Sequence, residues 1–328
     1  MSNTYELVRN RAALFDFSGE GRFFVSGAEA VVAVNGIIAA DLETIPELKA
    51  LNTVLLDEDG ALVAILWVLN DEDGVWVLCD EDRRSVVGER LSFSVQGRDA
   101  RFEDRTETTF CHAIIGAAAQ EITMAVAGDD IIGIPYLGFE PNTETDTLLC
   151  RLGYTGEFDY RFIAPRERAG ELQERITAAV TEFGLGPGDP EALPLLMIEM
   201  RSLSQRHHIP EGTDPIQAGL HWMIDFRKGK FPGYGVVHVR KSDPGRKALM
   251  LVLDTEDSPP AQTPVLIENR EVGHCAYVAW SPTVGKTIAL AYVDAGLAWV
   301  GVVFDVAGLD AHAISAPLFI TKTVSAAQ

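Results

Sequence analysis

The sequence predicts an α+β fold in which a mixed N-terminal region precedes an all-β C-terminal unit. Three observations predict it: helices with clear start signals, short apolar segments joined by Asp-Gly turns, and a strand-rich final stretch. The chain has 328 residues, of which 47% are apolar and 23% charged. This composition is that of a globular protein able to bury a large core in two or perhaps three domains.

Three helices are expected from their end signals. Ser26-Gly27-Ala28-Glu29 has the form of a capping box, and aliphatic residues follow it, which predicts a helix over about 27–40. Pro165 opens a second helix with apolar residues at helical spacing, and Gly184 ends it. A third helix is expected over about 191–203.

Three strands are expected between the first two helices. The apolar segments 51–56, 61–69 and 75–79 are separated by the hairpin-type pairs Asp59-Gly60 and Asp73-Gly74, so they form a meander. The middle segment has no polar residue on either face. It is therefore expected to be a central strand buried on both sides.

A domain boundary is expected near residue 243, within the polar, turn-rich segment 241–246. This divides the chain into a domain over 1–243, with two subdomains, and a C-terminal domain over 244–328. The second domain contains several strand-like segments and is expected to form a small β-barrel or Greek-key unit.

The charge balance excludes several classes of partner. The chain has 27 Lys and Arg against 48 Asp and Glu, a formal net charge of −21. Such a surface repels phosphodiester backbones and anionic lipids, so we expect a small-molecule partner rather than nucleic acid or a membrane. No signal peptide or membrane-spanning run is recognised, and four well-separated cysteines are expected to be reduced thiols, which indicates a cytoplasmic setting.

Several ordered segments carry motifs that define a family resemblance. Residues 14–18 read L-F-D-F-S, residues 151–157 read R-L-G-Y-T-G-E, and residues 214–220 read D-P-I-Q-A-G-L. In the C-terminal domain, residues 281–293 read S-P-T-V-G-K-T-I-A-L-A-Y-V. In this order they resemble the aminomethyltransferase family of the glycine cleavage system, the T-protein, and its folate-dependent demethylase relatives. The resemblance implies three subdomains arranged as a clover leaf around a folate cavity, with tetrahydrofolate or 5-methyltetrahydrofolate in the opening.

One departure from the family bears on the chemistry. The family has a G-G-x-x-D-D-L-I-V strand whose aspartate lies beside the reactive pterin nitrogen, but Val63 and Ala64 stand at the two acidic positions here. Aliphatic side chains cannot stabilise an iminium-like carbon electrostatically, so glycine cleavage proper is disfavoured. The K-G-C-x-x-G-Q-E signature of the iron–sulfur-maintenance relatives is also missing from residues 226–234.

Five residues are candidates for folate binding, each with a structural alternative. Glu199 matches the family glutamate that contacts folate, and it lies in an apolar helix where a carboxylate needs donors, from the pterin or from a structural salt bridge. Arg227 matches a basic residue near the folate or is a solvated surface arginine. Tyr154 closes over the pterin or packs in the core, Trp222 borders the family's cavity, and Asp80 lies near the folate or at a hairpin end.

Two adjacent histidines and one tyrosine are the catalytic candidates. His207 and His208 lie in a polar segment after the helix that carries Glu199. They are either part of a solvated loop or include one proton donor or acceptor, because an imidazole titrates near neutral pH. Tyr154 is the third candidate for proton transfer. No third ligand lies at a metal-binding spacing, so no metal site is expected.

These residues together predict a tetrahydrofolate-dependent methyltransferase or demethylase of one-carbon metabolism. It would move a methyl group between a small methylated compound, as donor or acceptor, and tetrahydrofolate. Methyl transfer depends mainly on alignment of donor, carbon and acceptor, so it requires a carboxylate less than iminium chemistry does. Two alternatives stay open: a catalytically silent folate-binding protein that acts as sensor, carrier or assembly partner, and a scaffold that binds no folate.

Overall fold

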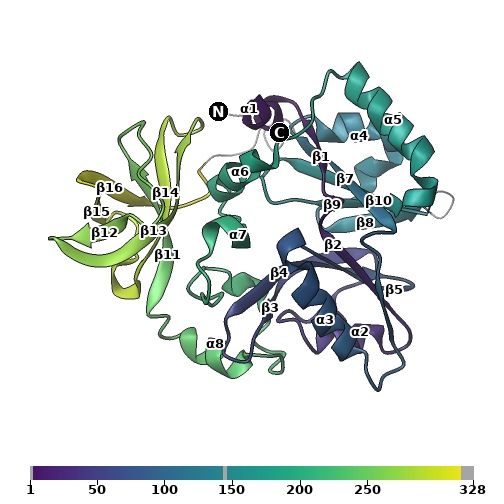
Figure 1. Ribbon diagram of the computed structural model, residues 1–328, viewed down its shortest axis with the longest axis horizontal. Helices are drawn as coiled ribbons and strands as arrows, with labels where there is room; N and C mark the ends of the chain where they lie inside the picture. Colours follow the sequence, from purple (N-terminus) through teal and green to yellow (C-terminus); the bar gives the residue numbers. More distant parts are fainter. Residues whose placement is uncertain (1–2, 143–145, 319–328) are drawn as a thin grey trace.

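The computed structural model of the chain describes residues 3–142 and 146–318. Figure 1 shows three lobes: two that share one large sheet, and a separate β-barrel formed by the C-terminal part of the chain. Helices α6 (Leu193–Glu199) and α7 (Gln205–His208) lie between the barrel and the other two lobes. This arrangement confirms the predicted α+β clover leaf.

A ten-stranded sheet runs through the first two lobes in the order β1-β7-β10-β9-β8-β3-β4-β5-β2-β6. All its paired strands are antiparallel. Its strands are β1 (Ala13–Asp16), β2 (Gly21–Ser26), β3 (Lys49–Leu56), β4 (Leu62–Asp71), β5 (Gly74–Cys79), β6 (Arg101–Asp104), β7 (Thr109–Gly116), β8 (Gly138–Asn142), β9 (Thr147–Leu152) and β10 (Phe158–Pro165).

The first lobe combines strands β1 and β7–β10 with helices α1 (Asn3–Asn10), α4 (Ala119–Ala127) and α5 (Ala169–Glu182). Helix α5 follows Pro165 after one 3-10 turn and ends before Gly184, whose φ is +59°. The predicted second helix is therefore confirmed. Its buried residue Ile176 packs in a core with Ile122 of α4 and Phe162 of β10.

The second lobe contains β2–β6 and the helices α2 (Ala30–Asn35) and α3 (Arg84–Ser94). Strands β3, β4 and β5 confirm the predicted meander, since β4 pairs antiparallel with both neighbours. The predicted first helix is shorter than expected. Gly27 has a φ of +106°, and a Cβ there would lie 2.6 Å from the Asp99 carbonyl oxygen, so the chain turns before the helix starts at Ala30.

Strand β4 is central, as predicted, but only one of its faces is fully buried over residues 62–67. Ala64 and Leu66 lie in the core that α2 and α3 cover, whereas Ile65 and Trp67 are half-buried. The prediction of two-sided burial is wrong for these odd-numbered positions, because their face of the sheet borders a cavity rather than a packed layer.

The segment between the sheet and the barrel is irregular. Besides α6 and α7 it holds the 3-10 turns η5 (Pro190–Ala192) and η6 (His221–Met223) and the helix α8 (Tyr234–Arg240). The helix expected over 191–203 ends at Glu199, because Arg201 adopts a φ of +59° and reverses the chain.

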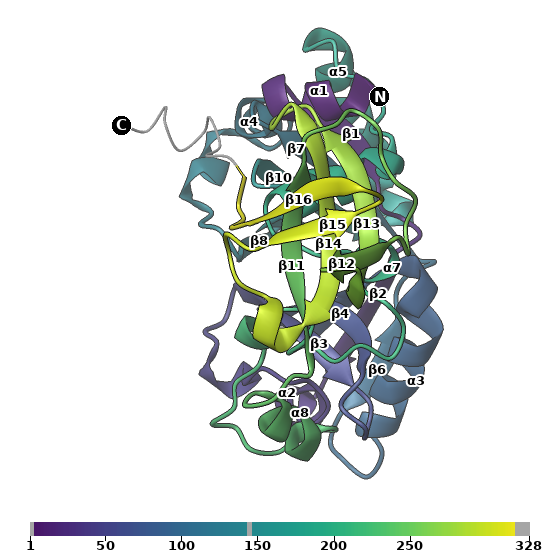
Figure 2. The ribbon, with the colours of Figure 1, turned by 90° about the vertical axis from the view of Figure 1, so that its left-hand side faces the viewer.

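The C-terminal lobe is a closed barrel, as the sequence predicted, and Figure 2 shows its face. Its strand order is β11-β14-β13-β12-β15-β16, and its interior is filled by buried residues such as Leu251, Ala289 and Phe304. The strands are β11 (Arg246–Leu253), β12 (Pro264–Ile267), β13 (Arg270–Ser281), β14 (Lys286–Asp294), β15 (Val303–Val306) and β16 (Leu309–Ile314).

Two further expectations concern the chain as a whole. The four cysteines are buried and free, which confirms the reduced thiols. Among the described residues, no helix combines the length and apolar character needed to cross a bilayer.

Candidate functional site

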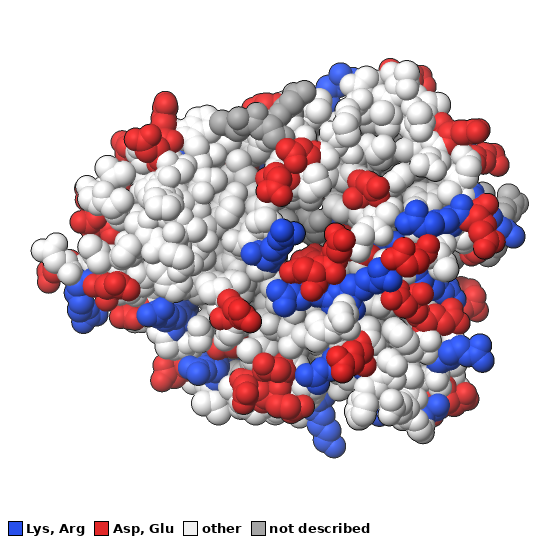
Figure 3. Space-filling model, in the orientation of Figure 1, with Lys and Arg blue, Asp and Glu red and all other residues white. Residues whose placement is uncertain are grey.

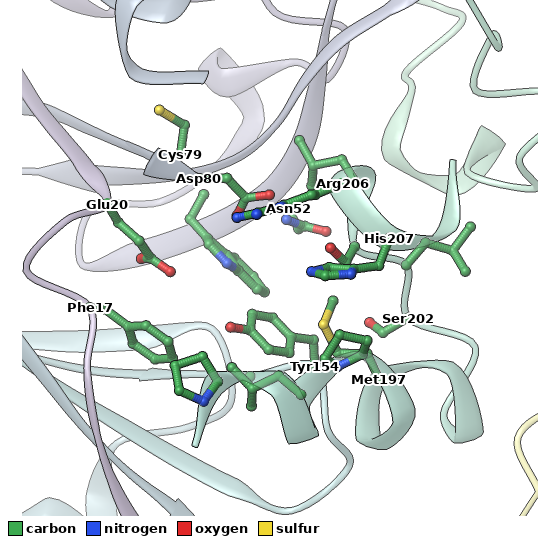
Figure 4. A pocket seen from close by; sticks show the side chains of 18 of the residues that line it. Phe17, Glu20, Asn52, Cys79, Asp80, Tyr154, Met197, Ser202, Arg206 and His207 are labelled. Carbon is green, nitrogen blue, oxygen red and sulfur yellow. The ribbon is translucent and has the colours of Figure 1, made fainter. Parts of the chain in front are cut away.

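A cavity of about 240 Å³ lies where the two sheet lobes meet the α6–α7 segment. Figure 3 shows the hollow in the middle of the molecule, with acidic and basic side chains on its rim. The lining comes from both sheet lobes and from the segment that carries α6, α7 and η6, as the close view in Figure 4 shows. The lining includes Phe17, Glu20, Asn52, Ile65, Trp67, Asp80, Tyr154, Leu193, Met197, Arg206, His207 and Trp222.

One part of the cavity wall is aromatic and apolar. Phe17 comes from the β1–β2 connection, Trp67 from β4 and Tyr154 from the β9–β10 connection, while Met197 of α6 closes the apolar surface. Burial raises the pKa of Tyr154, so its hydroxyl keeps its proton at neutral pH. Trp222 also lines the cavity, but its exposed fraction of 59% places it at the mouth. Such walls suit a flat ring system.

Another part of the wall is acidic. Glu20 lies in the β1–β2 turn, Asp80 follows β5, and Figure 4 shows both carboxylates directed toward the cavity. Burial raises the pKa of Glu20 to about 7, partly opposed by Arg161, and Asp80 raises it further. Burial and the neighbouring Asp82 also raise the pKa of Asp80. The pKa values of these cavity carboxyl groups therefore lie closer to neutral pH than those of solvated acids.

A buried arginine supports this acidic wall from behind. Arg161 Nη1 lies 3.0 Å from Glu20 Oε2, and Arg161 Nε lies 3.3 Å from Asp159 Oδ1. The guanidinium also lies 4.5 Å from the ring centre of Phe17 and 5.4 Å from that of Tyr154. Arg161 and Asp159 are fully buried, so two carboxylates share one guanidinium in a region with little solvent.

The two histidines face different surroundings. His207 lines the cavity, and burial lowers its pKa, so the imidazole is neutral at pH 7. His208 is fully buried outside the lining: its Nδ1 accepts a hydrogen bond from the Ser204 N–H at 2.8 Å, and its ring packs edge-on against Tyr277. Burial lowers the pKa of His208 to about 3. Of the two histidines, only His207 reaches the cavity, because successive residues on a helical turn point in different directions.

Glu199 is not among the residues that line this cavity, and its folate contact stays a prediction. Its carboxylate is fully buried and accepts hydrogen bonds from Tyr5 Oη at 2.8 Å, Arg9 Nη2 at 2.8 Å and Ser281 Oγ at 2.5 Å. The sequence correctly predicted that a carboxylate in this apolar helix needs donors. The chain itself supplies these donors from α1 and the barrel, so Glu199 joins three segments of the fold.

Arg227 is likewise outside the cavity. Its side chain is 89% exposed, and its guanidinium pairs with the Asp225 carboxylate at 2.9 Å. Arg227 thus lies at the surface, and its folate contact stays a prediction. An arginine that does line the cavity is Arg206 of α7, which precedes His207 in the sequence.

The cavity thus brings together Asp80, Tyr154, His207 and Trp222 from the sequence-predicted set. The sequence analysis missed Glu20 and Arg206. The available signal for Glu20 was an acidic residue two positions after the L-F-D-F-S motif, combined with the charged pair Asp159 and Arg161 in the mainly apolar segment 158–165. Neither Glu20 nor Arg161 suggests a cavity until the ion pair between these two residues is known.

Neither acid-free position on β4 lines the cavity. The carbonyl oxygen of half-buried Val63 accepts a hydrogen bond from Gln205 Nε2 at 3.0 Å, and Ala64 is fully buried on the opposite face of the strand. The two β4 side chains that line the cavity are Ile65 and Trp67. The carboxylates of the cavity therefore come from other segments than β4.

Comparisons with known proteins identify the family. Residues 1–228 match the family model described as the GCVT N-terminal domain, and residues 246–319 match the glycine cleavage T-protein C-terminal barrel domain. An aminomethyltransferase of Thermotoga neapolitana is 28% identical over 323 residues, which cover 95% of this chain and 87% of that protein. An aminomethyltransferase of Streptomyces avermitilis is 28% identical over 308 residues, covering 90% of this chain and 83% of that protein.

A solved structure agrees on the fold. The glycine cleavage system aminomethyltransferase T of Bartonella henselae superposes with a TM-score of 0.87 at 19% identity, covering 97% of this chain and 89% of that chain. This likeness extends over all three lobes described above. The chain therefore belongs to the glycine cleavage T-protein family.

Proposed function

We propose that this protein is a tetrahydrofolate-dependent one-carbon transferase that moves a methyl group between a small methylated compound and tetrahydrofolate. The observation that carries the proposal is the composition of the central cavity: aromatic walls, carboxyl groups and a neutral imidazole, in a protein of the T-protein family. Relatives named aminomethyltransferase support the transfer of a one-carbon unit.

The residues present fit a reduced folate. A pterin is a flat ring system whose edge carries N–H and amino donors, which suit the faces of Trp67 and Tyr154 and the acceptor oxygens of Asp80. Arg206 at the cavity provides a positive charge for the carboxylates of the glutamyl tail. When bound, tetrahydrofolate supplies the ring nitrogen that accepts or releases the carbon unit.

The chain's own residues would align the reactants and limit access of water. Phe17, Trp67 and Met197 contribute an apolar surface to the cavity, and Trp222 lies at the mouth where a bound ligand would cover it. Asn52 and His207 offer hydrogen bonds that fix orientation within this surface. Alignment of this kind is the main requirement of a displacement at a methyl carbon.

Calorimetric titration of the purified protein with tetrahydrofolate and with 5-methyltetrahydrofolate tests the proposal. We expect saturable binding that weakens at least tenfold in Asp80→Asn and Tyr154→Leu. Arg227→Gln is the matched control, because that side chain is exposed and outside the cavity. Absence of saturable binding to the wild-type protein would refute the proposal.

The apolar β4 wall favours a second function, folate binding without catalysis. Ile65 and Trp67 occupy the cavity face of the strand that carries the acidic pair in the family resemblance. A panel of ¹³C-methyl-labelled amines, ethers and thioethers, incubated with protein and tetrahydrofolate, separates the two functions. Formation of labelled 5-methyltetrahydrofolate supports the transferase, and binding without any label transfer supports the silent binding protein.

A further inference from the structure

We propose that Glu20 is the proton-transferring residue of the cavity and takes the place of the acid that strand β4 lacks. This inference rests on the proposed function, since it assigns a role in methyl transfer. The candidate is neither of the histidines nor the tyrosine that the sequence suggested. It is a carboxyl group in the turn between β1 and β2, on the side of the cavity where the ion pair with Arg161 lies.

The position of the carboxylate supports this role. Glu20 lines the cavity, and its side chain is only 18% exposed. One oxygen, Oε2, is held at 3.0 Å by Arg161 Nη1. Among the described residues, Oε1 has no hydrogen-bond donor, and Figure 4 shows the carboxylate directed into the cavity. One oxygen is therefore fixed by the protein while the other is available to a bound reactant.

The residues around Arg161 hold the Glu20 carboxylate in this position. Arg161 is held by Asp159 on the same strand, and the rings of Phe17 and Tyr154 lie within 5.4 Å of the guanidinium carbon. Because Arg161 is fully buried, its side chain cannot swing into solvent when the charge on Glu20 changes. The oxygen of Glu20 is thus positioned before any ligand arrives, as general acid–base catalysis requires.

The charged and titratable groups around Glu20 come from four other parts of the fold. Arg161 and Asp159 lie on β10, Asp80 follows β5, Arg22 lies on β2, and Tyr154 follows β9. Burial, Asp80 and Asp159 favour the protonated form of Glu20, while Arg161 and Arg22 oppose it, and the pKa rises from 4.5 to about 7. Both protonation states are then populated near neutral pH, which is the condition for efficient proton exchange.

The neighbouring groups are less suited to the same role. Tyr154 keeps its proton because burial raises its pKa, so it serves as a hydrogen-bond donor. His207 is held neutral by burial, but among the described residues no hydrogen bond fixes its ring, whereas Arg161 fixes the Glu20 carboxylate. Asp80 lies at the end of a strand beside Asp82 and Arg83 and is better placed to accept hydrogen bonds from a ligand.

The proposed step is balanced without an added reactant. The bond between the donor heteroatom and its methyl carbon breaks, and that heteroatom keeps the electron pair. A new carbon–nitrogen bond forms with the lone pair of the acceptor amine, which loses its N–H proton to the Glu20 carboxylate. Protonated Glu20 then delivers a proton to the departing heteroatom, so the carboxylate is restored and no oxidant or reductant is consumed.

Glu20→Gln tests the inference, because glutamine keeps the size and the hydrogen-bond acceptor but cannot titrate. Glu58→Gln is the matched control, since Glu58 is an exposed residue of the β3–β4 turn. The first measurement is a ¹³C NMR titration of glutamate carboxyl groups in the ligand-free protein. We expect one resonance with a midpoint near pH 7 that is missing from Glu20→Gln and retained in Glu58→Gln.

The second measurement is the pH profile of single-turnover methyl transfer from labelled donors to tetrahydrofolate. We expect Glu20→Gln to lower the rate at least 100-fold, to remove the limb near pH 7, and to change tetrahydrofolate affinity less than threefold. A missing NMR titration near pH 7, or an unchanged rate profile in Glu20→Gln, overturns the role of Glu20 while the proposed function stands. If the wild-type protein shows no saturable binding of tetrahydrofolate, the proposed function itself is overturned.

Discussion

Tyr5 Oη lies 2.8 Å from Glu199 Oε1, so the first helix of the chain is bonded directly to α6, 194 residues later. Arg9 Nη2, on the next turn of α1, reaches Glu199 Oε2 at 2.8 Å. Ser281 of the barrel donates to the same carboxylate. A single buried acid therefore holds together the N-terminal helix, the central segment and the C-terminal domain.

Replacing Glu199 with alanine is expected to destabilise the fold rather than the ligand site. The change removes one of the two carboxylates that pair with the buried Arg9 guanidinium, while Glu157 remains at 3.3 Å. Loss of a hydrogen-bond acceptor in a buried position costs about 1–3 kcal/mol of unfolding free energy. Urea denaturation measures this loss, with Glu182→Ala on the exposed surface of α5 as control.

The same variant distinguishes a structural role from a ligand contact. Without urea, and at a temperature where circular dichroism shows that the variant is folded, its affinity for 5-methyltetrahydrofolate should stay within threefold of wild type. A fall of more than tenfold with normal stability would show that Glu199 contacts the ligand after all.

The two adjacent histidines should separate into one functional and one structural residue. His207→Gln is expected to reduce ligand binding or turnover about tenfold with little change in stability, because its ring borders the cavity. His208→Gln is expected to lose about 1–3 kcal/mol of stability, since the Ser204 N–H loses its acceptor in a buried position. Denaturation and binding measured on both variants check this; equal effects of the two changes would contradict the placement.

The local features of the fold could be predicted from the sequence. The Asp-Gly turns at 59–60 and 73–74 and the apolar runs beside them predict the β3–β5 meander because hairpin signals act over a few residues. The α5 helix and the barrel have equally local signals. The helix boundaries near Gly27 and Arg201 were misplaced because both residues adopt a positive φ, and at Gly27 the backbone also lies against the distant Asp99 carbonyl.

The site was only partly predictable, for a similar reason. Asp80, Tyr154, His207 and Trp222 follow from a resemblance that fixes positions along the chain, and the structure places all four at the cavity. Glu20 depends on Arg161, which is 141 residues away in sequence, so no local pattern reveals the pair. Glu199 matched a family position, but its partners Tyr5 and Ser281 lie in the first helix and the last domain.

Introducing an aspartate into β4 should cost more stability at Ala64 than at Ile65. Ala64→Asp is expected to cost at least about 3 kcal/mol of stability, because this residue is fully buried in an apolar core. Ile65→Asp, one residue later on the cavity face, should cost less because the carboxylate reaches solvent through the cavity. Thermal unfolding of the two variants compares them; a greater loss for Ile65→Asp would contradict the assignment of the two faces.

The contribution of Glu20 to the stability of the protein should fall as pH rises from 5 to 8. The folded-state pKa of Glu20 is about 7, above its ordinary value of 4.5, so the folded protein binds the proton more tightly than the unfolded chain. The stabilisation is present below pH 4.5 and is lost as pH rises through 7. The difference between the two pKa values corresponds to about 2–3 kcal/mol between pH 5 and 8.

Urea denaturation of wild type and Glu20→Gln at pH 5, 6, 7 and 8 isolates this contribution, because Asp80 and Asp159 titrate in both proteins. The free energy of unfolding of the wild type, minus that of the variant, should decrease by about 2–3 kcal/mol over this range. Glu58→Gln should give a constant difference. A difference for Glu20→Gln that is flat with pH would mean that Glu20 is ionised throughout in the folded protein, because a slope arises only where the folded protein and the unfolded chain bind different numbers of protons.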